Sequence, residues 1–164
     1  MTTLGHELRL VHNPALGAVL LWRFARSYSE AHQVHAPAPL PLSALVLPMV
    51  WHSDTLSHVT STRVASGLRA LADKFTDHQL DVLLALHGRA SRWRDKTEDA
   101  LRMGISTGIL RLSPEGGLVA GDADWSLNAQ APTIRAQIAA AEKVGAWFSI
   151  LSLREISLTL NVRF

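Results

Sequence analysis

Apolar residues that recur at helical spacing are the feature that most restricts what this chain can fold into. The first such stripe follows Asn13-Pro14, a pair that caps free backbone amides and opens a helix. The members of the stripe lie on one helical face: Leu16, Leu20, Phe24 and Tyr28. The spacing predicts a helix over about 14–29 with one buried side.

The same periodicity predicts six further helices. Leu42–His52 is apolar nearly all round, which is typical of a buried helix, and Pro48 is expected to kink it or restart it. Two capping boxes, S/T-x-x-E/Q in form, are expected to open helices at Thr76 and Ser152. The remaining predicted helices are 62–75, 95–107 ended by Gly108, and a long one that Pro132 opens.

One convincing β signal interrupts the helices. Ile109–Leu112 reads as a strand, Ser113–Gly117 as a turn, and Leu118–Ala120 as the returning strand. The three prolines of Ala31–Pro41 predict an extended linker, and Asp122–Ala131 predicts a loop that holds Trp125.

The expected fold class is therefore mainly α (α+β), in a single domain over 1–164. Residues 1–41 would supply an N-terminal helix and the Pro-rich linker. Residues 42–120 would form a winged-helix-like unit, three helices followed by the β-hairpin 109–120. The C-terminal helices, about 132–160, would pack on that unit.

Composition limits the compartment and the surface. Hydrophobic residues make up 48% and charged residues 18%, so either the core is large or a partner covers apolar surface. The chain has no cysteine, which excludes disulfides, cysteine zinc sites and thiol nucleophiles, and favours a reducing compartment. The N-terminus lacks a secretory signal pattern, and the longest apolar run, Leu40–Trp51, is too short to span a bilayer. We expect a cytoplasmic protein without membrane contact.

Motifs of metal binding and nucleotide binding are missing. The histidine pairs His32/His35 and His52/His58 are not part of an HExxH motif, so scattered or capping histidines are expected. The strings GxxxxGK[ST] and GxGxxG are absent. GxSxG occurs once, as Gly104–Gly108, at the end of the predicted helix 95–107 and not on a turn from a strand into a helix. We therefore predict no catalytic residue, no metal and no cofactor. A hydrolase built from histidines and acids such as Glu98-Asp99 stays open, because sequence alone does not exclude paired carboxylates.

A basic cluster is the most specific surface feature. Arg89, Arg92 and Lys96 could share a helix face and neutralise phosphates. Two acids of the helix 95–107, Glu98 and Asp99, would however repel the phosphates of a nucleic acid. A DNA-binding winged-helix regulator is thus the alternative to a protein-contact module. The candidate interface combines this cluster with the C-terminal tail: Arg89, Arg92, Trp93, Arg94, Lys96, Arg163 and Phe164.

Several strings together resemble one family, from about residue 11 to the C-terminus. They are Asn13–Ala18 with Leu21–Phe24, Ser61–Arg69, Gly108–Leu112 before Gly116–Leu118, Ala141–Phe148, and the ending Val162–Phe164. They resemble the middle component of three-component ABC (ABC-3C) systems, which are prokaryotic conflict or anti-phage loci related to Lamassu-like systems. The resemblance implies a non-catalytic adaptor that links an SMC/Rad50-like ABC ATPase, the sensor, to an effector protein such as a nuclease.

Overall fold

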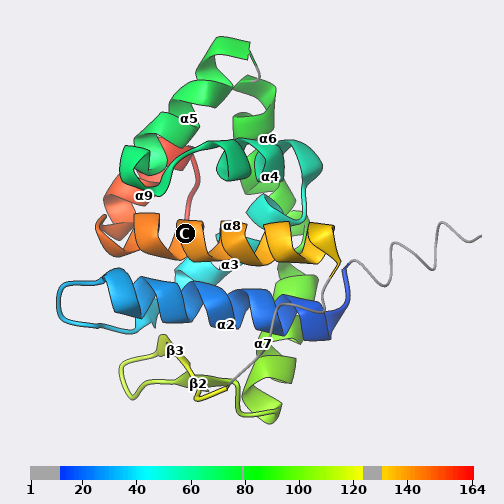
Figure 1. Cartoon of the computed structure of the whole chain (residues 1–164), viewed down its shortest axis with the longest axis vertical. Coiled ribbons are helices and arrows are strands. Elements are labelled where there is room, and N and C mark those ends of the chain that lie inside the picture. Colours follow the sequence, from blue (N-terminus) through cyan, green and yellow to red (C-terminus); the bar gives the residue numbers. More distant parts are fainter. Residues whose placement is uncertain (1–11, 79, 124–130) are drawn as a thin grey trace, which may run out of the picture.

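The computed structural model describes residues 12–78, 80–123 and 131–164. Within these ranges the chain is mainly α-helical, as the periodicity predicted, with one small sheet (Figure 1). The helices are α2 (Pro14–Ala31), α3 (Ser43–Val50), α4 (Ser53–Ser61), α5 (Gly67–His78), α6 (Leu80–Arg92), α7 (Arg94–Ser106), α8 (Pro132–Ser149) and α9 (Leu153–Leu160). The shorter elements are β1 (Ala38–Pro39), β2 (Leu110–Leu112), β3 (Gly117–Ala120) and the 3₁₀ turns η1 (Leu40–Leu42) and η2 (Val64–Ser66).

The pair α2 and α8 forms the middle of the molecule. Figure 1 shows the two helices side by side, with α4, α5, α6 and α9 above them and α7 and the sheet below. The predicted cap opens α2, since the Asn13 side chain accepts from the Leu16 amide at 2.7 Å. Phe24 of α2 and Phe148 of α8 meet edge to face with ring centroids 6.1 Å apart, and both are fully buried.

Gly145 sets the distance between these two helices. A Cβ atom at this position would lie 2.5 Å from the Phe24 carbonyl oxygen and 3.0 Å from the Tyr28 amide nitrogen. Both neighbours are backbone atoms, which cannot rotate away as a side chain could. The absence of a side chain at Gly145 therefore allows α8 to lie directly against the backbone of α2.

The sheet is antiparallel, with strand order β1-β3-β2. The hairpin β2–β3 is as predicted, but the third strand was missed, because it comes from the Pro-rich segment expected to be a linker. Ala38 pairs with Leu118, and Pro39 is tolerated because β1 is an edge strand. The sheet is anchored on α2, where the Trp22 indole donates to the Gly121 carbonyl at 2.9 Å.

The winged-helix detail is not confirmed. The hairpin follows α7 in sequence as expected, yet its strands lie against α2 and α7, and β3 also pairs with β1. The sheet thus packs with the N-terminal helix that the prediction had placed outside the unit.

Several predicted boundaries differ from the structure. The capping box expected at Thr76 does not open a helix, because α5 continues to His78. Ser53–Ser61, for which no helix was predicted, is itself a helix, with His52 as its N-cap. The predicted Trp125 loop falls largely outside the described residues. The Ser152 capping box is confirmed with both of its hydrogen bonds, and Asn161 ends α9 in the left-handed conformation.

Candidate interaction surfaces

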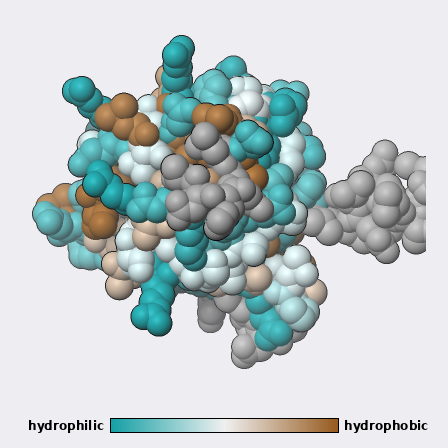
Figure 2. Space-filling view, turned by 90° about the horizontal axis from the view of Figure 1, so that it is seen from above, coloured by the Kyte–Doolittle hydropathy of each residue, from teal (hydrophilic) through white to brown (hydrophobic). Residues whose placement is uncertain are grey.

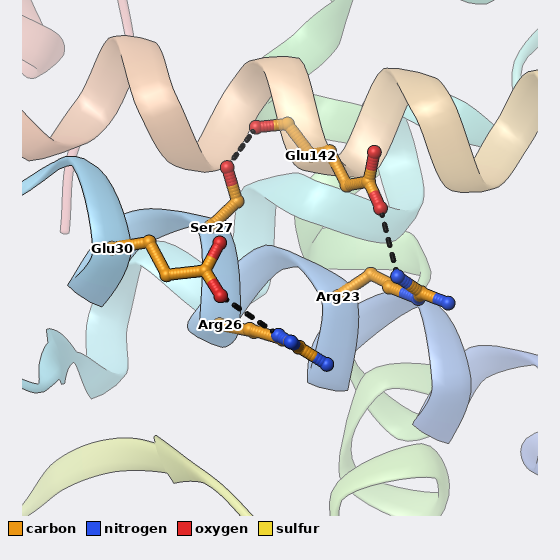
Figure 3. Close-up of a pocket in the computed structure, with 5 residues that line it drawn as sticks. All are labelled: Arg23, Arg26, Ser27, Glu30 and Glu142. Carbon is orange, nitrogen blue, oxygen red and sulfur yellow. Dashed lines mark hydrogen bonds and ion pairs between the residues drawn. The ribbon is translucent and has the colours of Figure 1, made fainter. Parts of the chain in front are cut away.

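A charged cavity of about 210 Å³ opens between α2 and α8 (Figure 3). Arg23 pairs with Glu142 across the two helices at 3.1 Å, and Arg26 pairs with Glu30 within α2 at 2.8 Å. The Ser27 hydroxyl donates to the Glu142 backbone carbonyl at 2.7 Å. Each carboxylate here has an arginine partner, so the charges that line the cavity balance. The Arg23–Glu142 ion pair and the Ser27 hydrogen bond join α2 to α8.

The histidines are spread over several local contacts. His52 caps α4 by accepting from the Thr55 amide, His32 ends α2, and His58 packs against Phe75. Among the described residues, no group of three or more histidines and acids is placed to hold a metal ion. The capping role expected for histidines is therefore found at His52.

Partial burial lowers the pKa of His52, and the nearby Arg89 guanidinium lowers it further, against the raising effect of Asp54. The unfolded chain therefore binds a proton on His52 more readily than the folded chain does. Folding stability should fall as pH drops below 6.5, the ordinary pKa of histidine. We expect His52→Asn, which keeps a capping acceptor but cannot titrate, to flatten this loss. Thermal melts of both proteins between about pH 7.5 and about pH 5 measure it. An equal fall in melting temperature for both would contradict the assignment.

The structure corrects one residue of the candidate interface. Arg89 was expected on an exposed basic face, but it is only 4% exposed. Its guanidinium donates to the Pro48 carbonyl and to the Thr55 hydroxyl, both at 3.1 Å. Pro48 lies in the last turn of α3, where carbonyls have no partner within the helix. Arg89 therefore serves as an internal cap that joins α6 to α3 and α4.

The rest of the basic cluster lies at the junction of α6 and α7. Arg92 is exposed, Arg94 is paired with Glu98 at 3.0 Å, and Lys96 lies over the Trp93 ring at 5.2 Å. Trp93 is half-buried against the Trp51 and His12 rings, so it is part of an aromatic cluster. Sequence reasoning placed Arg89, Arg92 and Lys96 on one face. Of these three, Arg92 and Lys96 are exposed and have no salt bridge with a described residue.

The C-terminal tail contacts α6. The Arg163 amide donates to the His87 ring at 3.4 Å, and Val162 is buried. Arg163 and Phe164 themselves are exposed, with Phe164 at half of its full exposure. Both tail candidates are therefore accessible to a partner.

Two apolar grooves were not foreseen. The first, here called the α5–α9 groove, has a volume of about 260 Å³ and is lined by Ser66, Gly67, Leu68, Arg69, Ile150, Leu151, Glu155, Leu158 and Thr159. The second, the α2–α7 groove, has a similar volume and is lined by Ala15, Ala18, Val19, Trp22, Met103, Thr107, Ile109 and Ala123. Figure 2 shows the general pattern, hydrophobic patches set among hydrophilic side chains on the upper face of the molecule.

Comparison with known proteins decides the family. The family model described as ABC-three component (ABC-3C) system Middle Component 3 matches residues 1–164. The chain belongs to this Middle Component 3 family. Neither a curated protein nor a solved structure matches it. The resemblance seen in the sequence is thus confirmed at the level of the middle component.

A sequence signal for the α5–α9 groove of this Middle Component 3 protein does exist. In α9, Ile156 and Leu160 are buried. Leu158, two residues from each of them, lies on a different side of the helix and is 73% exposed. Ile150 directly follows α8, outside the stripe that buries Val144 and Phe148, and is 68% exposed. Apolar residues out of phase with the buried stripe therefore mark this surface.

A lysine in the Middle Component 3 protein was also missed. The Lys143 ammonium donates to the carbonyls of Val59, Thr60 and Thr62, at 3.3, 2.8 and 3.0 Å. It thereby caps the end of α4 from α8, a role that only the tertiary structure brings about. Within the described ranges, every helix is too short or too polar to cross a membrane.

Proposed function

We propose that this Middle Component 3 protein is a non-catalytic, cytoplasmic adaptor. It joins an SMC/Rad50-like ABC ATPase, the sensor, to an effector such as a nuclease in a prokaryotic defence system. Its membership in the middle-component family of a three-component system supports a role beside other proteins. The relation to Lamassu-like systems is part of this proposal.

The observation that carries the proposal is the pair of apolar grooves. An adaptor has to hold two partners at once, which requires two separate surfaces. The α5–α9 groove and the α2–α7 groove share no lining residue. Figure 1 places α9 above the central helix pair and α7 below it, so the two surfaces face different parts of the surroundings.

The exposure of the groove residues agrees with binding. Ile150 and Leu158 each leave most of their side chain in water, and Met103 in the other groove is 38% exposed. Burying a large aliphatic side chain contributes about 1.5–3 kcal/mol, so a partner that covers these residues gains affinity. Exposed apolar surface of this kind is typical of sites where proteins bind.

The test is co-expression of the three components with a tag on the ATPase. The effector should be retained with the ATPase when the middle component is present and lost when its gene is omitted. An empty vector in place of that gene is the control. If the ATPase retains the effector equally well without the middle component, the adaptor role is wrong.

A further inference from the structure

We infer that the α5–α9 groove binds an amphipathic helix with acidic flanks from another component of the same system. This inference rests on the proposed adaptor function and assigns one of its two surfaces. It follows from the apolar floor of the groove, the charge of its rim and the backbone that lines it.

The floor of the groove is apolar and belongs to three elements. Leu68 at the start of α5 is buried, while Ile150 after α8 and Leu158 on α9 are exposed. The neighbouring Val64 of η2 is 50% exposed and Leu153 of α9 is 38% exposed. A nucleic acid would gain little from such a floor, because its outer surface is phosphate and sugar.

The rim of the groove is basic. Arg69 lines the groove, and Arg154 lies four residues before the lining residue Leu158, on the same side of α9; both arginines are exposed. Neither is in a salt bridge with another described residue, although the charge of Arg69 acts on the Glu155 carboxylate. The rim is therefore complementary to acidic side chains on a partner.

The acid in the groove is already engaged. The Glu155 carboxylate accepts from the Ser152 amide at 2.7 Å and from the Ser152 hydroxyl at 2.8 Å, as part of the α9 capping box. These bonds lower the pKa of Glu155, with the amide as the larger cause. Glu155 thus stays ionised to hold α9, and it offsets only part of the charge of the surrounding arginines.

The backbone around the groove favours a helical occupant. The groove is lined by helices and turns, which offer no strand edge to which an extended peptide could add. The first-turn amides of α5, which have no partner within that helix, can instead meet an acidic side chain. A helix brings its backbone hydrogen bonds with it and presents apolar side chains at i, i+3, i+4 and i+7. It can therefore fill the groove without leaving buried backbone groups unpaired.

The first experiment compares one substitution at two exposed leucines. Leu158→Asp places a carboxylate on the groove floor and should weaken binding of the component that uses the groove by at least about tenfold. Leu84→Asp is the matched control, since Leu84 is 49% exposed on α6 and does not line the groove. It should change affinity less than about twofold. Affinity is measured by titrating each purified partner component, and circular dichroism checks that both variants fold.

The second experiment tests the rim. Arg69→Glu should weaken the same interaction and reduce its dependence on salt, because one attractive charge pair becomes repulsive. A Leu158→Asp variant that binds both components as the unmodified chain does would overturn the groove assignment. The adaptor proposal would survive that result, whereas failure of the unmodified chain to bind either component would end both.

The third experiment identifies the occupant. A photo-crosslinking residue at position 158 of the assembled three-component complex should capture a peptide with apolar residues at helical spacing and acids beside them. Capture of a second copy of this chain would contradict the inference and indicate self-association. Capture of an extended or basic segment, or of no partner peptide at all, would likewise contradict it.

Discussion

Gly145→Ala should lower the free energy of unfolding by about 1–3 kcal/mol, although alanine is the better helix former. The new methyl group would lie 2.5 Å from the Phe24 carbonyl oxygen, closer than real Cβ atoms approach backbone. Relief requires α2 and α8 to separate, and these helices make the most extensive contact between elements in the described structure. Buried pairs such as Phe24 and Phe148 would then lose packing.

The matched control is the same substitution at Gly88, which also lies inside a helix. A Cβ atom there meets only the flexible end of Arg92, at 3.6 Å. Gly88→Ala should therefore stabilise the protein by about 0.5–1 kcal/mol, the usual gain in helix propensity. Urea titration followed by circular dichroism measures both variants. The opposite signs are the decisive result, and a stabilised Gly145→Ala variant would show that the two helices are not in close contact.

Arg89→Ala should cost about 2–4 kcal/mol of folding stability, because two acceptors lose their donor at once. The Pro48 carbonyl and the Thr55 hydroxyl both bond the guanidinium, and Thr55 is only 2% exposed. Each unsatisfied buried group costs about 1–3 kcal/mol. Part of this stability loss is offset, because the substitution also removes a buried cation. Burial lowers the pKa of Arg89 from the ordinary arginine value, which shows that its charge is partly desolvated.

Arg92→Ala provides the control for that result. Arg92 lies one turn further along the helix but is exposed, so its removal should change stability by no more than about 0.5 kcal/mol. Chemical denaturation at neutral pH distinguishes the two variants. Equal stability of the Arg89 variant and the unmodified chain would mean that Arg89 faces solvent, and would return it to the basic surface that the sequence suggested.

The helical part of the fold was predictable because its signals are local. The Asn13 cap, the Ser152 capping box and the stripe along α2 each lie within a few residues, and each is found in the structure. The hairpin was predictable for the same reason, since Gly116 takes a positive φ of 82° in the turn.

The rest depended on long-range contacts. β1 is a strand only because β3 pairs with it, and no pattern within Ala31–Pro41 indicates that pairing. Arg89 looked like a surface cation because the carbonyl it caps, at Pro48, lies elsewhere in the sequence. The α5–α9 groove combines two helices and a corner, so it was not predicted, although its exposed apolar residues Ile150 and Leu158 lie outside the buried stripes of α8 and α9.

The packing of α2 against α8 has a consequence for how the protein is made. The two helices are joined through Arg23 and Glu142, which are 119 residues apart in the chain. At a synthesis rate of about 5–20 residues per second, α2 leaves the ribosome roughly 6–24 seconds before α8 is complete. During that interval the side of α2 that packs on α8, which includes Phe24, has no final partner. The nascent chain therefore has to shelter this side of the helix, in a transient collapse or on a chaperone, until α8 has been translated.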